Sequence, residues 1–124
     1  ELAIKEASIL IRCTLPDTPG EKETFDYGDG KKTAAIDADK VQFPLQIRPR
    51  LSGDYFYPLG FGKRKKLQDY FVDEKIPRDV RDSIPLLVSN NDIVWIVGHR
   101  LDERYRIDKN TKRILKFEVK PLKF

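Results

Sequence analysis

The sequence predicts an α+β fold, in which a compact mixed or antiparallel sheet, or a sandwich, carries two short helices. Several segments alternate apolar and polar residues as half-buried strands do, and one has the i, i+3, i+4 apolar spacing of a helix. The 124 residues, 40% hydrophobic and 35% charged, suit one domain that can bury a core. We therefore expect one compact domain, with a strand-and-turn lead-in over residues 1–40 and the main unit over 41–124.

The first expected strand covers residues 8–15, where alternate side chains are apolar. Cys13 lies on the apolar face and is expected in the core. A polar, turn-rich segment follows, and residues 33–41 and 43–50 are the next strand candidates. Pro49 has no N–H to donate, which favours an edge or a bulge for the second of these strands.

Two short helices are expected after the glycine- and proline-rich segment 51–62. The first is predicted to begin near Lys65, and Pro77 is expected at the start of the second, over 77–84. The apolar stripe of the first helix consists of Leu67, Tyr70 and Phe71.

Four further strands are predicted over 84–88, 92–97, 100–107 and 113–119. In the third, alternation turns Asp102 outward. A single core is expected between the strands and the first helix. Its predicted members are Phe43, Leu45, Ile47, Leu67, Phe71, Leu86, Val88, Val94, Ile96 and Ile114.

The positive charge is concentrated in one segment. The chain has a net charge of +4, yet residues 48–66 alone carry +5 and the remainder −1. Such a cluster indicates either a phosphate-binding surface or a solvated basic face. Within it, Arg48 and Arg50 are expected on one face of a strand, and the four cations of residues 63–66 fall where the helix begins. Cations oppose the helix dipole there, whereas a bound phosphate would match them.

Aromatic residues are interleaved with these cations. They can stack on nucleobases, although Phe56 and Phe61 also suit the core. The four are Tyr55, Phe56, Tyr57 and Phe61.

Features typical of enzymes are sparse, and we predict no catalytic, cofactor-binding or metal-binding residue. His99 is the only histidine and Cys13 the only cysteine, so no nucleophile–base pair is apparent. Asp102 and Glu103 follow His99, but on an alternating strand these three side chains would point to opposite faces. A small hydrolase with an acidic metal site is retained as a third possibility.

The remaining composition points to a cytoplasmic protein without a membrane segment. The apolar runs are too short to span a bilayer, no secretory signal is visible, and a lone cysteine suits a reducing compartment. The chain contains no methionine and begins at Glu1, so we expect it to be a piece of a longer protein.

A family resemblance is carried by "IRPRLSGDYFYPLGFGKRKKLQDYFVDEKIPRDVRDSIPLLV", followed by "DIVWIVGHRLDERYRI" and "TKRIL". This pattern resembles the C-terminal domain of bacterial tRNA(Ile)-lysidine synthase (TilS), over about residues 41–119. The resemblance implies the PheT/TilS-like fold, which is also found in the phenylalanyl-tRNA synthetase β chain.

The resemblance also implies a function. The parent enzyme would be a ligase that uses ATP to attach lysine to the wobble cytidine of the isoleucine tRNA with a CAU anticodon. The family's S-G-G-x-D-S adenylation loop is absent here, so ATP and lysine are expected to bind a missing N-terminal catalytic domain. This chain would hold the tRNA acceptor region, lack catalytic activity of its own and have the N-terminal domain as a partner, with a homodimer formed through the parent as a further possibility.

The tRNA-binding residues predicted from the charge cluster and the family's basic positions span several elements. They are Arg48, Arg50, Lys63, Arg64, Lys65, Lys66, Arg78, Arg81, Arg100 and Arg104.

The rival function is a protein–protein docking module that packs on a catalytic domain or a second subunit.

Overall fold

The computed structural model describes residues 2–4, 9–17 and 28–121, and it confirms the α+β class. One antiparallel sheet has the strand order β1-β2-β10-β3, a second has the order β4-β7-β8-β9, and β5 pairs with β6 as a separate ribbon. The strands are β1 (Leu2–Ile4), β2 (Ile9–Asp17), β3 (Thr33–Asp37), β4 (Gln46–Arg48), β5 (Tyr55–Phe56), β6 (Lys65–Lys66), β7 (Leu86–Ser89), β8 (Asp92–Ile96), β9 (Arg100–Leu101) and β10 (Ile114–Pro121). The helices are α1 (Leu67–Asp73), α2 (Arg78–Arg81) and the 3₁₀ helix η2 (Glu103–Tyr105).

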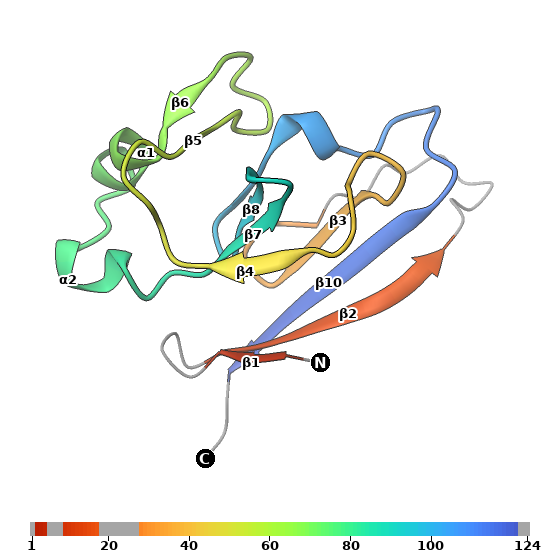
Figure 1. Ribbon diagram of the computed structural model, residues 1–124, viewed down its shortest axis with the longest axis horizontal. Coiled ribbons are helices and arrows are strands. Elements are labelled where there is room, and N and C mark those ends of the chain that lie inside the picture. The colour runs from red at the N-terminus through yellow and green to blue at the C-terminus, as the bar shows by residue number, and fades with distance from the viewer. Residues whose placement is uncertain (1, 5–8, 18–27, 122–124) are drawn as a thin grey trace.

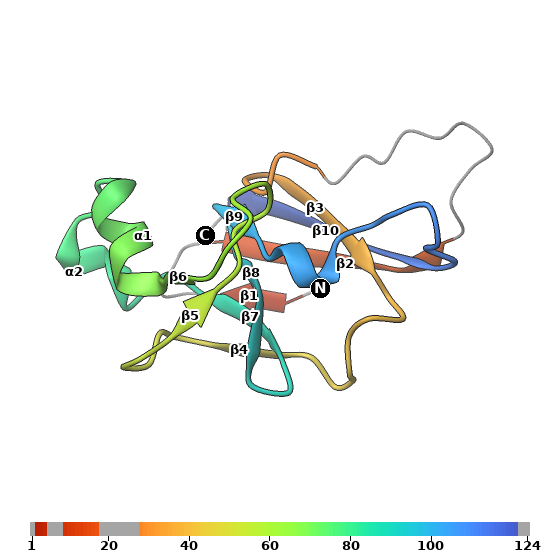
Figure 2. The same ribbon diagram turned by 90° about the horizontal axis from the view of Figure 1, so that it is seen from above.

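The second sheet lies in the middle of the molecule (Figures 1 and 2). The first sheet covers one of its faces, while β5 and α1 cover the other. Both views place α1 and α2 at one end of the molecule, away from β2 and β10. The β5–β6 ribbon is therefore held beside α1 rather than within either sheet.

Two hydrophobic clusters are present where one was predicted. Leu87 and Trp95, which are paired across β7 and β8, pack toward the first sheet. Leu86 and Ile96 are the next pair along and pack toward α1. A strand that is buried on both faces contributes side chains to two layers, because its successive residues point in opposite directions.

Trp95 and Cys13 lie in different environments. Trp95 is fully buried, and its indole Nε1–H donates to the Gly30 carbonyl at 2.9 Å. Cys13, in contrast, is exposed, so its prediction as a core residue is wrong.

The first helix begins later than predicted. Lys65 and Lys66 have extended conformation, because they pair with Phe56 and Tyr55 across the ribbon, and α1 starts at Leu67. Its inward residues are those predicted. The second helix, α2, follows Pro77 as expected.

The strand predicted over 100–107 ends at Leu101. The Asp102 carboxylate accepts a hydrogen bond from the Arg104 backbone N–H at 2.8 Å and so starts the η2 helix, as an N-cap residue does. Asp102 is fully buried, which corrects its predicted outward position.

Two aromatic side chains predicted or considered for the core are exposed. Phe43 is 58% exposed, and it precedes β4, which covers only Gln46–Arg48 of the strand predicted over 43–50. Phe61 is 43% exposed, whereas Phe56 is fully buried. No helix in the described part of the chain is long and apolar enough to cross a membrane.

We predict that trimming the inward face of α1 destabilises the fold. Leu67→Ala should lower the free energy of unfolding by about 2–5 kcal/mol and Phe71→Ala by about 3–5 kcal/mol, because both side chains are buried against the second sheet. Urea denaturation measures both changes. Val72→Ala is the matched control, since Val72 lies on the same helix and is 56% exposed. Decreases below about 1 kcal/mol at both inward sites would contradict the packing described.

Candidate nucleic-acid interface

The candidate interface is built on the basic ribbon, which we define as residues 55–66. Tyr55 pairs with Lys66 and Phe56 with Lys65 across its two strands. Because neighbouring strand residues point to opposite sides, Phe56 is buried while Tyr55 stays 40% exposed. The ribbon thus has one face on the protein and one face in solvent.

Three cations of the ribbon lack a carboxylate partner within the described residues. These are Lys63, Arg64 and Lys66, and all three are exposed. Lys63 and Arg64 instead contact aromatic rings: the Lys63 ammonium lies 5.4 Å from the Phe61 ring centre, and the Arg64 guanidinium lies 4.6 Å from that of Tyr55. Their charge is therefore available to an anionic ligand.

The other three cations of the charge cluster are paired. Arg48 makes a bidentate ion pair with Asp54, with both nitrogen–oxygen distances at 2.9 Å. Arg50 Nε lies 2.8 Å from Asp82 Oδ1. Lys65 forms an ion pair with Asp73 on α1.

The Arg48–Asp54 pair organises the turn before β5. Asp54 also accepts a hydrogen bond from the Leu51 backbone N–H, so the same carboxylate caps the turn and orients Arg48. Arg48 and Arg50 do not act from one strand face, because β4 ends at Arg48. Contact between Arg48 and phosphate stays a prediction.

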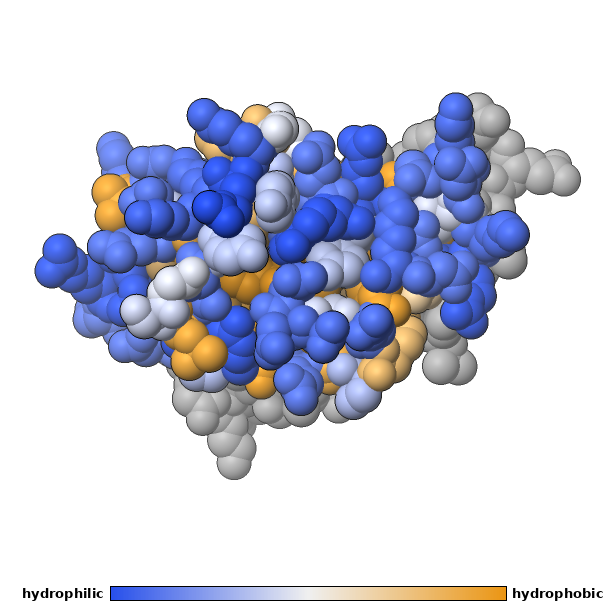
Figure 3. Space-filling model, turned by 45° about the horizontal axis from the view of Figure 1, so that its top comes forward, coloured by the Kyte–Doolittle hydropathy of each residue, from blue (hydrophilic) through white to orange (hydrophobic). Residues whose placement is uncertain are grey.

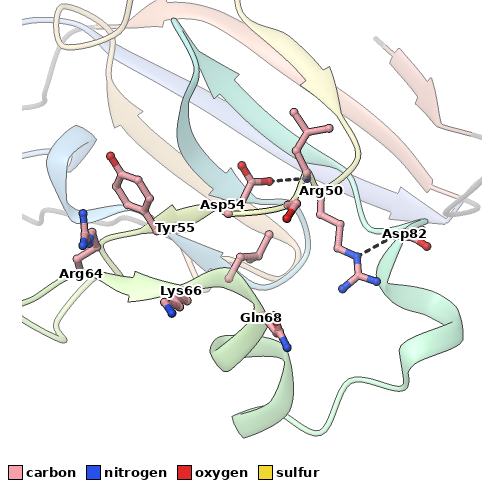
Figure 4. A pocket seen from close by; sticks show the side chains of 11 residues that line it. Arg50, Asp54, Tyr55, Arg64, Lys66, Gln68 and Asp82 are labelled. Carbon is pink, nitrogen blue, oxygen red and sulfur yellow. Dashed lines mark hydrogen bonds and ion pairs between the residues drawn. The ribbon is translucent and has the colours of Figure 1, made fainter.

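A hollow of about 680 Å³ lies between this turn, β6 and the start of α1 (Figure 4). Arg64 and Lys66 lie on its ribbon side, and Arg50 extends on the other side toward Asp82. The face shown in Figure 3 is mostly hydrophilic, and apolar side chains appear on it only as small separate areas. On the ribbon side the hollow therefore offers two exposed cations to an anionic ligand, whereas on the other side Arg50 is already paired with Asp82.

Arg104 connects the ribbon to the buried carboxylate of Asp102. Its Nε and NH2 donate to the buried Asp102 carboxylate at 3.0 Å each, and its guanidinium lies 4.5 Å from the Tyr57 ring centre. Burial acts against the charged form, but the hydrogen bonds to Asp102 together with the negative charges of Asp102 and Asp92 outweigh it and raise the pKa of Arg104. Arg100 likewise donates to the Leu59 carbonyl. Both arginines hold the ribbon in place through contacts within the protein.

The two predicted arginines of α2 lie apart from the ribbon. Arg81 is buried, donates through Nε to the Ile76 carbonyl and lies 5.9 Å from the Phe71 ring centre. Arg78 is exposed at the start of the helix. The predicted set of ten is thus divided among the ribbon, its supports and a separate helix.

The groups considered for a metal site do not converge. Asp102 faces Arg104 and the Tyr57 backbone N–H, which donates to it at 2.9 Å. Burial lowers the pKa of the His99 imidazole, which is therefore neutral at pH 7. Over residues 2–4, 9–17 and 28–121, no three His, Cys, Asp or Glu side chains form a group that could hold a metal ion.

The role of Asp102 is one that the sequence did not predict. The signal that could have identified it is the run Leu101-Asp102-Glu103, in which an Asp follows an apolar residue and precedes an acidic one, as at a helix N-terminus. The strand alternation around it concealed this signal.

This fold is also found in solved structures, two of which are similar over most of this chain. One is described as "Crystal structure of TILS C-terminal domain"; it matches with a TM-score of 0.79 and 23% identity, over 99% of this chain and 91% of that one. The other is an N-terminal fragment of the phenylalanyl-tRNA synthetase β-subunit from Pyrococcus horikoshii, with a TM-score of 0.62 and 16% identity, over 94% of this chain and 40% of that one. By fold, the chain is in the class of small α+β domains to which these structures belong.

Sequence comparison identifies the family. The family model "TilS substrate C-terminal domain" matches residues 45–118, and the chain belongs to this family. The tRNA(Ile)-lysidine synthase of Caldanaerobacter subterraneus subsp. tengcongensis is 43% identical over 93 residues, which are 75% of this chain and 20% of that protein. The enzyme of the same name from Parabacteroides distasonis is 47% identical over 91 residues, 73% of this chain and 21% of that protein. The chain therefore spans about a fifth of the length of these curated relatives, and the resemblance read from the sequence is confirmed.

We predict that removing the aspartate destabilises the fold strongly at one aspartate–arginine pair and weakly at another. Asp102→Ala should lower the free energy of unfolding by about 3 kcal/mol or more, because it leaves Arg104 and the Tyr57 N–H without their buried acceptor. Asp39→Ala should cost less than about 1 kcal/mol, because Asp39 and its partner Arg113 are both about half exposed. Thermal and urea denaturation measure both. Equal decreases would mean that Asp102 does not anchor the ribbon.

Proposed function

We propose that this chain is the tRNA-holding C-terminal domain of a tRNA(Ile)-lysidine synthase. Membership of the TilS C-terminal family and the names of the curated relatives support the parent assignment. In the parent, ATP and lysine would be used by an N-terminal catalytic domain outside this chain, to modify the wobble cytidine of an isoleucine tRNA. The partners of this chain would be that domain, the tRNA and a second copy of the parent. All of them would meet in the bacterial cytoplasm.

The observation that carries the proposal is the division of the charge cluster into paired and unpaired cations. Arg48, Arg50 and Lys65 are each paired with an aspartate. Two of the three unpaired cations, Arg64 and Lys66, lie beside the hollow (Figure 4), and the third, Lys63, is exposed on the same ribbon. RNA phosphates are the ligands for which grouped, solvated cations give the largest gain, because each contact releases a condensed counterion.

A docking module is the second candidate, and one observation favours it. Val72 and Val80 are 56% and 40% exposed on α1 and α2, at the end of the molecule where both helices lie. Neither side chain belongs to the ribbon, so a protein contact at these helices would leave the unpaired cations of the ribbon available to RNA. Salt dependence separates the two modes of binding.

We predict that tRNA affinity falls with salt. For about three phosphate contacts, one for each unpaired cation of the ribbon, the logarithm of the association constant should fall against the logarithm of salt concentration with a slope of about −2 to −3. Arg64→Gln combined with Lys66→Gln should flatten this slope by about one for each phosphate that is no longer neutralised, and by similar amounts for unrelated RNA sequences. Fluorescence anisotropy with labelled tRNA measures the slope.

The matched control is Lys109→Gln combined with Lys112→Gln. It removes the same charge from exposed positions in the loop before β10, on another part of the molecule. The control should leave the slope unchanged. A salt-independent affinity, or equal effects of the two double variants, would refute phosphate binding by the ribbon.

A further inference from the structure

Two aromatic rings on the basic ribbon are left unexplained by phosphate binding. Tyr55 and Phe61 are 40% and 43% exposed, although the neighbouring Phe56 is fully buried. A single exposed aromatic side chain needs no explanation. These two, however, lie within one ribbon and each contacts a cation that lacks a carboxylate partner among the described residues.

The loop geometry presents Phe61 to solvent. Phe61 lies between Gly60 and Gly62, whose φ angles of +82° and +84° are ones that side-chain-bearing residues rarely adopt. A Cβ atom at either glycine would meet nothing within 4 Å, so this part of the loop stands clear of the body. The Lys63 and Lys65 ammonium groups lie 5.4 and 5.1 Å from the ring centre. The loop therefore carries an exposed ring with cations beside it.

Tyr55 is held more rigidly, at the edge of the hollow (Figure 4). Its backbone is paired with that of Lys66, and the Tyr57 ring packs against it in a T-shaped arrangement with 6.3 Å between ring centres. The Arg64 guanidinium lies 4.6 Å from its ring centre. A ring that is already held by its backbone pairing and by a neighbouring ring loses little further freedom when a flat ligand stacks on it.

We propose that Tyr55 and Phe61 stack on unpaired nucleobases, while the adjacent Lys63, Arg64 and Lys66 bind the phosphates of the same nucleotides. Exposed aromatic side chains and arginine planes are the groups on which unpaired RNA bases stack. A base inside a duplex has both faces covered by its neighbours. The inference rests on the proposed function and narrows its ligand to RNA in which a duplex adjoins unpaired nucleotides.

A protein partner fits this surface less well. The centre of a protein interface is depleted of lysine and other charged residues, whereas both rings here lie among cations. The exposed large apolar side chains without a ring–cation contact lie outside the ribbon, and they are Phe43, Leu51, Val72 and Val80. The ribbon rings are therefore assigned to a ligand that is both aromatic and anionic.

The test compares three RNAs that share one hairpin duplex. The first is blunt, the second has four unpaired adenosines at its 3′ end, and the third has four abasic nucleotides there, so that the second and third have equal numbers of phosphates. The adenosine extension should bind about tenfold or more tightly than the abasic one, which is the contribution of a single stacked base. A matched pair of 5′ extensions tests the other polarity.

The variants locate the effect. Tyr55→Leu combined with Phe61→Leu should abolish the gain from adenosines and leave the salt slope unchanged. Phe43→Leu, which alters a more exposed aromatic side chain outside the ribbon, should retain the gain. Because Tyr55→Leu could disturb the ribbon, Phe61→Trp provides a second readout: its indole fluorescence should be quenched by the adenosine extension and not by the abasic one.

The outcomes distinguish the inference from the function on which it rests. Salt-dependent binding of the blunt duplex, with equal affinity for adenosine and abasic extensions of both polarities, would overturn the stacking inference alone. A gain that persists in the double variant, or one that disappears in Phe43→Leu, would also overturn it. Failure of all the RNAs and of tRNA to bind would refute the proposed function, and the inference with it.

Discussion

The position of the basic ribbon depends on a buried carboxylate. Asp102 is fully buried and accepts hydrogen bonds from the Tyr57 backbone N–H and from three groups of Arg104: the backbone N–H, Nε and NH2. Backbone bonds from Leu59 N–H to the Leu101 carbonyl and from Glu103 N–H to the Tyr57 carbonyl continue this junction. The second sheet thus holds the start and end of the loop that carries the ribbon. A carboxylate shielded from water is stable in the folded protein only when a positive group, here Arg104, compensates its charge. An ion pair inside the protein thereby fixes where the external cations lie.

Ion pairing within the protein also explains why four cations follow one another in the run Lys63-Arg64-Lys65-Lys66. Its cations do not occupy the first turn of a helix, because residues 65 and 66 form the second strand of the ribbon and Lys66 only caps α1. Lys65 turns to Asp73 on the helix, while Lys66 lies opposite Tyr55 beside the hollow. One lysine of the run thus ties the ribbon to α1, and its neighbours keep their charge for a ligand. The helix dipole, which made these cations look misplaced in the sequence, has little bearing on them.

Much of the fold could be predicted from the sequence because its signals are local. The apolar stripe of α1, the strands around Val88 and Trp95, and Pro77 before α2 all follow from short-range periodicity and backbone chemistry. The division into two cores could not be predicted, because it depends on which layers cover the two faces of β7 and β8. For the site, charge clustering pointed to one segment, yet sequence alone could not divide its cations into paired and unpaired ones. That division depends on Asp54, Asp73 and Asp82, which reach their partners only through the tertiary fold.

Amide hydrogen exchange of the chain with and without bound tRNA measures whether the ribbon is the RNA-binding surface. We predict slower exchange in peptides covering residues 55–68 on addition of tRNA, with the peptides of α2 and of the loop at 108–112 unchanged. Slower exchange confined to the residues around Val72 and Val80, with the ribbon unaffected, would contradict it and would place the contact on the helical end of the domain.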